Sequence, residues 1–160
     1  MTISAEYLAG FFDGEGCINI AVRGRAKQVV LRIMLVNTDY EFLKEVQSEY
    51  GGRLSRRQHK AKPHWKPFCC VTWTNNHAAR FLGVLAPYLR VKRKQVDLAI
   101  EFLEFQFRPR RERCDIITVP CSGMKNGRRN YMRRSEATLQ GERRFRERMG
   151  ELNMKGVRRG

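Results

Sequence analysis

Two acidic residues separated by one glycine lie near the start of the chain, and their types and spacing suit metal-assisted chemistry. Ser4 can cap a helix over residues 4–14, which places Glu15, two residues after Asp13, at the C-terminal end of that helix. A carboxylate is unfavourable there because the helix dipole is negative at that end. If two such helices paired about a two-fold axis, their Glu15 carboxylates would converge and repel unless a cation lay between them. Carboxylate oxygens suit Mg²⁺, so the residues predict a phosphodiester hydrolysis site.

Two glycines on the same helix indicate how such helices would approach each other. Gly10 and Gly14 are four residues apart and therefore share one helix face. Because they lack side chains, they allow a second helix to come close to backbone contact. Leu8, Phe11 and Phe12 provide bulk for the core of the chain itself. The alternative for this segment is a short capped helix followed by a turn that carries no chemistry.

Hydrophobic periodicity predicts the elements that position these residues. Alternating apolar and polar residues predict strands, and apolar residues spaced by three or four predict helices. Strands are expected at 17–23, 28–36, 53–57 and 67–74. After the first helix, further helices are expected at 38–50, where Thr38 opens a capping box, at about 76–86 and at about 92–107. The last of these carries one apolar face, formed by Val96, Ile100, Leu103 and Phe107. The order of elements indicates an α+β domain.

Residues 7–16 read YLAGFFDGEG, and this segment resembles the signature of the LAGLIDADG homing endonucleases. The segment PYLRVKRKQ at 87–95 resembles the basic stretch before the last core helix of that family, and the resemblance covers about residues 3–107. The second acid is Glu15 rather than the commoner Asp, although family members carry either. The resemblance implies the αββαββα homing-endonuclease fold, in which a concave four-stranded antiparallel sheet lies along the major groove of DNA.

The single copy of the signature implies the homodimeric type of this family. The helix of residues 4–14 would lie at the two-fold axis, with Tyr7, Gly10 and Gly14 at the dimer interface. A two-fold dimer reads a double-stranded DNA target with matching half-sites, so the expected target is long and pseudo-palindromic.

The resemblance also implies catalytic roles. Glu15 would bind the metal, Mg²⁺ with Mn²⁺ as a possible substitute, and the Gly14 carbonyl would be a further ligand. Lys92 matches a basic residue near the active-site water and the scissile phosphate, the alternative being a basic first turn of a helix. Asn37 matches a polar residue that orients water, or else simply starts the next helix. Asp13 is expected to have a structural role.

Alternation within the strands nominates residues that would read DNA, because Arg and Gln make bidentate contacts with base edges. The alternative for each residue is a solvated sheet face, and the fourth strand nominates no reader because it is bulky on both faces. The nominated side chains are Asn19, Arg23, Arg25, Gln28, Arg32, Met34, Arg53, Ser55 and Arg57. Six basic residues are expected to contact the phosphates of the DNA backbone. Three lie in a basic loop, Lys60, Lys62 and Lys66, and three lie at the start of the last core helix, Arg90, Arg93 and Lys94.

The net charge of +16 and the pI near 10.4 favour a polyanionic partner. Residues 1–107 carry 16 basic and 10 acidic residues, hence +6, whereas residues 108–160 carry 16 and 6, hence +10. We therefore divide the chain into a core at 1–107 and a basic extension at 108–160. Residues 109–133 are expected to be loop, and a helix is expected at 135–153, with Leu139, Phe145, Met149 and Leu152 on one face. The extension would wrap DNA, or its helix would dock on the core or on a partner subunit.

Composition excludes several other classes of protein. Hydrophobic residues make up 42% of the chain, too many for a disordered basic tail, and no apolar stretch is long enough to span a membrane. Five cysteines and a first segment without a basic, apolar leader favour an intracellular protein, cytoplasmic or organellar, with reduced thiols. Cys114 and Cys121 have no second pair of Cys or His residues at zinc-finger spacing.

Three functions are compatible with these features. The intact signature favours a site-specific, metal-dependent DNA endonuclease carried by a mobile element such as an intron. An intron RNA maturase on the same fold would use the basic extension for RNA and would not need Glu15. A non-catalytic DNA-binding regulator would be expected to have lost the acid, which is present.

Overall fold

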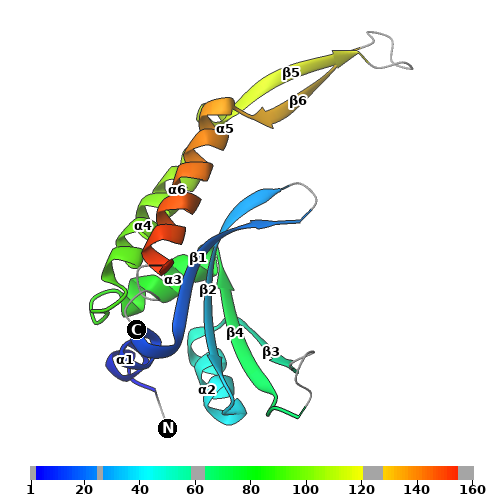
Figure 1. Cartoon of the computed structure of the whole chain (residues 1–160). Helices are drawn as coiled ribbons and strands as arrows, with labels where there is room; N and C mark the ends of the chain where they lie inside the picture. Colours follow the sequence, from blue (N-terminus) through cyan, green and yellow to red (C-terminus); the bar gives the residue numbers. More distant parts are fainter. Residues whose placement is uncertain (1–2, 25–26, 59–63, 121–127, 155–160) are drawn as a thin grey trace.

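A four-stranded antiparallel sheet forms the centre of the structure (Figure 1). The computed structural model describes residues 3–24, 27–58, 64–120 and 128–154, with the backbone alone described at 118–120 and 128–131. The strands are β1 (Gly16–Arg23), β2 (Gln28–Asn37), β3 (Arg53–Arg57) and β4 (Phe68–Thr74), in the spatial order β1-β2-β4-β3. The four predicted strands and the α+β class are confirmed.

Four helices pack against one face of this sheet. They are α1 (Ala5–Glu15), α2 (Tyr40–Tyr50), α3 (Asn76–Leu85) and α4 (Arg93–Phe107). Ser4 caps α1 by accepting from the Tyr7 N–H, as predicted. The cap of α2 differs from the prediction, because Asp39 rather than Thr38 accepts the N–H of Phe42. A carboxylate is the stronger acceptor, so the helix begins one residue later than the capping-box pattern suggested.

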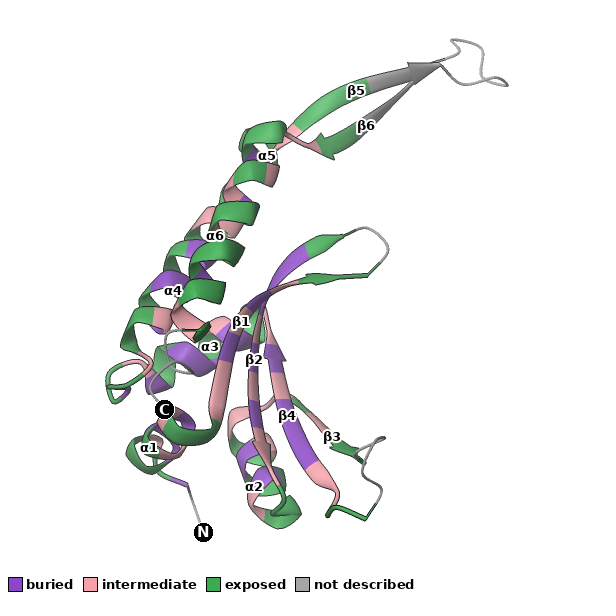
Figure 2. Ribbon diagram, viewed as in Figure 1, coloured by how far each residue is buried: buried purple, intermediate pink, exposed green. Residues whose placement is uncertain are grey.

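The core lies between the sheet and these helices (Figure 2). Alternation sends Ile18, Ile33 and Trp73 toward the helices, where each is at most 1% exposed. The Trp73 ring stacks on Phe81 with centroids 4.0 Å apart, and its indole N–H donates to the Tyr50 carbonyl at 3.0 Å. The core is therefore continuous from β4 through α3 to α2.

The buried face of α4 is wider than predicted and is rotated. Val96 and Leu103 are buried as expected, but Ile100 and Phe107 are 41% and 60% exposed, so the prediction was wrong at these two positions. The buried set is completed by Leu98, Ala99 and Phe102. The reason is a second neighbour: Phe102 and Phe105 of α4 each contact Phe145 of the C-terminal helix, with ring centroids 5.5 Å apart. Packing on two sides shifts the apolar face.

The extension is ordered into α5 (Arg110–Arg113), β5 (Cys114–Pro120), β6 (Arg128–Arg134) and α6 (Glu136–Met154). The prediction of a loop at 109–133 was wrong, because β5 and β6 pair as an antiparallel hairpin. Neither face of this hairpin is packed on the core, so no apolar alternation was required of its sequence (Figure 1).

The predicted C-terminal helix is confirmed, and it docks on the core of its own chain. Met149 is fully buried, and Phe145 and Leu152 pack against the core cluster. The Asn153 amide donates to the Ile18 carbonyl at 3.1 Å and thereby satisfies a backbone group of the edge strand β1. Among the described residues, no helix is both long enough and apolar enough to cross a membrane.

Candidate active site and DNA interface

Glu15 is the last residue of α1 and is exposed to solvent. The chain passes directly from α1 into β1 at Gly16, and a Cβ atom on Gly16 would collide with the buried ring of Phe12. Only glycine fits this turn, and Phe12 anchors the helix beneath it. The backbone of Glu15 is therefore held at the junction between the helix end and the sheet.

Asp13 has the structural role that was expected of it. Its carboxylate accepts hydrogen bonds from the backbone N–H groups of Arg90, Val91 and Lys92, at 2.8, 3.1 and 3.0 Å. Partial burial acts to raise the pKa of the Asp13 carboxyl, but these donors and the Lys92 charge outweigh it, so its pKa lies below the ordinary value. Asp13 therefore joins the end of α1 to the loop that starts α4.

This loop brings Lys92 to the same place. The Lys92 ammonium donates to the Asp13 carbonyl, two residues before Glu15. It also lies close to Cys17 at the start of β1: burial raises the pKa of the Cys17 thiol, whereas the positive charges of Lys92 and Arg32 act in the opposite direction. The Lys92 cation thus lies at the C-terminal end of α1, where the exposed Glu15 is the last residue.

Asn37 ends β2 at the same end of the sheet as Glu15, since the strand register pairs Gly16 with Leu35. Its side-chain oxygen accepts from the Asp39 N–H at 2.8 Å, which forms the turn into α2. This local bond corresponds to the helix-start alternative.

The donor atoms at this end of α1 fit a hard divalent cation. They are the Glu15 carboxylate and backbone carbonyls, including that of Gly14, and oxygen donors are those that Mg²⁺ prefers. Within the described residues, no three His, Cys, Asp or Glu side chains gather to form a metal site.

The predicted dimer residues form an open face on α1. Tyr7 is 60% exposed, and a Cβ atom built on Gly10 or Gly14 would meet nothing within 4 Å. The three residues are spaced by three and four, so they follow one line along the helix. The helix thus presents nearly bare backbone beside the exposed Glu15.

The sheet face opposite the helices carries a shallow groove lined by most of the predicted readers. Strand pairing sets Arg23 beside Gln28 and Asn19 beside Arg32. The groove is lined by Ala21, Val22, Arg23, Val30, Arg32, Arg53, Ser55, Arg57, Thr72 and Thr74. Its arginines come from β1, β2 and β3, so positive charge extends across the sheet.

Other predicted contacts lie outside this groove. Asn19 lines a separate hollow with Arg143 and Arg146 of α6, and Met34 is half-buried. Lys66 is exposed before β4, whereas Arg25, Lys60 and Lys62 lie outside the described residues.

The basic residues around Lys92 divide into different environments. Arg90 is exposed. Arg93 contacts its own chain, pairing with Asp97 at 3.2 Å and donating to the Ala86 carbonyl at 3.0 Å. Lys94 lines a hollow between α4 and α6 with Asp97. The structure therefore does not bring Arg93 and Lys94 together with the sheet groove.

Two groove residues were missed by the sequence analysis. Thr72 and Thr74 of β4 line the groove, and the register sets Thr72 between Met34 and Arg53. The signal was present in the strand: Val71 and Trp73 are buried, and the small polar residues alternate with them. The bulk of Phe68 at the start of the strand obscured this pattern.

Comparisons with known proteins agree with this geometry. The family model described as LAGLIDADG endonuclease matches residues 8–102. The DNA endonuclease I-CvuI of Chlorella vulgaris is 29% identical over 105 residues, which span 61% of this chain and 62% of that protein's length.

Solved structures show a similar fold. The crystal structure of I-CvuI in complex with its target matches with a TM-score of 0.67 and 20% identity, covering 92% of this chain and 80% of that one. The archaeal intron-encoded homing endonuclease I-Vdi141I, complexed with DNA, matches with a TM-score of 0.61 and 14% identity, covering 92% and 82%. The signature on α1, the sheet and the family match lead to one conclusion: this chain belongs to the LAGLIDADG endonuclease family.

Proposed function

We propose that this protein is a site-specific DNA endonuclease that acts as a homodimer and hydrolyses phosphodiester bonds of a long pseudo-palindromic duplex. The observation that carries the proposal is the end of α1, where exposed Glu15 adjoins the bare helix face of Gly10 and Gly14. Pairing of two such faces would bring two Glu15 carboxylates together at one axis.

Dimerisation supplies what a single chain lacks. Two glycines on an exposed helix face permit close approach of a second helix. Their surroundings are open, so the pairing needs no rearrangement of the chain's own core. Two copies of the sheet groove would then lie in line on either side of the axis, which suits a target with two half-sites.

The residues fit Mg²⁺, with Glu15 of each chain and the Gly14 carbonyl as protein ligands. When bound there, the metal supplies activation of water and stabilisation of the leaving oxygen. Lys92 places a positive charge at the same end of α1, where it stabilises charge developing on the phosphate. Asp13 holds the loop that carries Lys92, and Asn37 contributes a polar group from the end of β2.

The groove supplies sequence recognition. Arg23, Arg32 and Arg53 line it from three strands, and arginine reads guanine through two hydrogen bonds in the major groove. Thr72 and Thr74 add small hydroxyl groups. These can contact base edges directly or through a bridging water molecule.

The proposal is tested by recovering, from a pool of random duplexes, the DNA that the purified protein retains in Ca²⁺. The recovered duplex is then incubated with the protein in Mg²⁺, in Mn²⁺ and in EDTA. The expected result is a two-fold-related target that is cut at two positions across its centre when Mg²⁺ or Mn²⁺ is present. Retention of an intron RNA with no cutting of any recovered duplex would favour the maturase, and retention of one duplex that stays intact would favour a regulator.

A further inference from the structure

The β5–β6 hairpin, here called the arm, projects from the rest of the chain (Figure 1). Ile116 is 70% exposed and Met132 is 53% exposed. A two-stranded ribbon is marginally stable in water by itself, and exposed apolar residues on it indicate a surface used for contact. The arm is therefore expected to bind something beyond its own chain.

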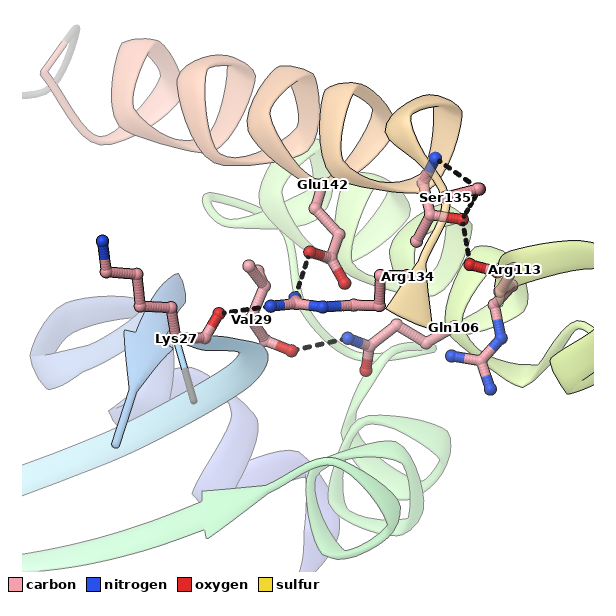
Figure 3. Close-up of polar contacts among 8 residues, drawn as sticks. Lys27, Val29, Gln106, Arg113, Arg134, Ser135 and Glu142 are labelled. Carbon is pink, nitrogen blue, oxygen red and sulfur yellow. Dashed lines mark hydrogen bonds and ion pairs between the residues drawn. The ribbon is translucent and has the colours of Figure 1, made fainter. Parts of the chain in front are cut away.

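The root of the arm is fixed to the DNA-binding sheet. Arg134, the last residue of β6, donates to the buried carboxylate of Glu142 at 2.6 Å and to the Lys27 carbonyl in the β1–β2 turn at 3.0 Å (Figure 3). At the other strand, the Arg113 carbonyl accepts from the Ser135 N–H at 2.9 Å. These contacts set the direction of the arm relative to the β1–β2 hairpin.

The positive charge of the arm and its root favours a polyanionic partner. Residues 108–134 carry nine Lys or Arg against two Asp or Glu, a balance of +7. Arg111 and Arg133 are exposed, and neither side chain forms a hydrogen bond or ion pair within the part of the chain that the structure describes. A basic ribbon of two strands fits the major groove of a duplex and can contact its phosphates.

The position of the arm in the molecule indicates which part of the duplex it would contact. Figure 1 places α1 at one end of the molecule and the arm at the other, and both the arm and the distal ends of β1 and β2 point away from the helices. In a dimer with α1 at its axis, the two arms would lie at the outer ends, far from the partner subunit. Strands of seven residues extend about 23 Å, the length of about seven base pairs.

We propose that the arm binds the DNA that flanks the segment covered by the four-stranded sheet, and so lengthens the contacted duplex at each end. This inference rests on the proposed function for the dimer axis and for the DNA face of the sheet. It adds a separate contact that depends mainly on phosphate charge, with the sheet retaining the reading of bases.

The test compares three double variants of the full chain on the duplex recovered by selection, placed within long flanking DNA. Arg111→Gln/Arg133→Gln removes one charge from the arm and one from α5 at its root. Lys44→Gln/Arg80→Gln removes two exposed charges from α2 and α3, on the opposite side of the sheet, and is the matched control. Arg111→Lys/Arg133→Lys keeps the charge. Hydroxyl-radical protection and the dependence of binding on salt are measured for each.

For the arm variant, protection should be lost at the outer ends of the footprint while the central protection remains. The slope of log K against log salt should fall by about 3.6, which corresponds to two phosphate contacts in each of the two arms of the dimer, and Kd near 0.1 M salt should rise by at least about a hundredfold. The control and the lysine variant should retain the outer protection.

The inference would be overturned if the Arg111→Gln/Arg133→Gln variant kept the outer protection and the salt slope of the control. It would also be overturned if Ile116→Ser changed the oligomeric mass without changing the footprint, because that would indicate a protein partner. Absence of any discrete protected segment with the unmodified protein would instead count against the proposed function.

Discussion

Replacing Asp13 with asparagine should loosen the loop that carries Lys92 and destabilise the protein. In the native chain, Oδ2 of Asp13 accepts from Arg90 and Val91, and Oδ1 accepts from Lys92. An asparagine has one acceptor oxygen, so if it keeps the first two bonds its NH₂ group faces the N–H of Lys92. One charge-assisted bond is lost and two become neutral.

The cost follows from these changes. Bonds to a charged acceptor contribute about 1.5–3 kcal/mol each and neutral bonds about 0.5–1.5 kcal/mol. Because the loop is partly exposed, we reduce the sum by about half and expect Asp13→Asn to lower the free energy of unfolding by about 2–3 kcal/mol at pH 7. The matched control is Asp97→Asn, which removes an exposed ion pair with Arg93 and should cost below about 1 kcal/mol.

The pH dependence provides an independent check. The pKa of Asp13 is lowered in the folded state, so its stabilising contribution is present above the unfolded pKa of about 3.9 and is lost as the pH falls through the folded pKa. Urea unfolding of the native protein and the variant should therefore differ at pH 7 and converge as the pH falls below about 4. The same difference in unfolding free energy at both pH values would refute the assignment of the loop contact to the Asp13 charge.

Three further outcomes are expected. Gly10→Leu should convert the dimer to a monomer in analytical ultracentrifugation and abolish cleavage, while raising monomer stability by up to about 1 kcal/mol because leucine is the better helix former; a cleaving dimer would contradict the interface. Arg134→Met should cost about 3 kcal/mol at pH 7, since it leaves the Glu142 carboxylate buried without its partner. Burial already raises the pKa of Glu142 against the opposing effects of Arg134 and Arg113, so stability falls as the pH rises from about 4.3 through the folded pKa. The loss of unfolding free energy in the variant should therefore be smaller at about pH 4 than at pH 7, and a loss independent of pH would contradict this cause. Arg32→Ala should weaken binding about 5- to 150-fold for each of the two half-sites and relax the preference at one base position in each, measured by repeating the selection; an unchanged selected sequence would remove Arg32 from the readers.

Strands β1, β2 and β4 could be predicted because one face of each is buried. That requirement imposes alternation, as in Ile18 and Ile20 of β1 and Val71 and Trp73 of β4. The arm could not be predicted in this way, because neither of its faces is packed on the core. The face of α4 was misjudged at Ile100 and Phe107 because the docking of α6 is a long-range contact that a local pattern does not contain.

In the candidate site too, the features that depend on local spacing could be predicted from the sequence, and those that depend on long-range contacts could not. Glu15 and the open glycine face follow from local spacing along one helix. The contact of Asp13 with residues 90–92 joins segments far apart in the chain, so only the structure reveals how Lys92 reaches the end of α1. The threonines of β4 became evident as groove residues once the register with β2 and β3 was known.

Glu15→Gln tests the central claim most directly, because it removes the charge of the proposed metal ligand and keeps the size of an exposed side chain. Its affinity for the selected duplex in Ca²⁺ and its cleavage rate in Mg²⁺ are measured beside those of the native protein and of Glu45→Gln, an exposed glutamate of α2. We predict that Glu15→Gln binds the duplex with a Kd within about threefold of the native value and cuts it at least about a thousandfold more slowly, a loss of about 4 kcal/mol of transition-state stabilisation. Cleavage by Glu15→Gln at a rate near that of Glu45→Gln would contradict the claim that this carboxylate holds the catalytic metal.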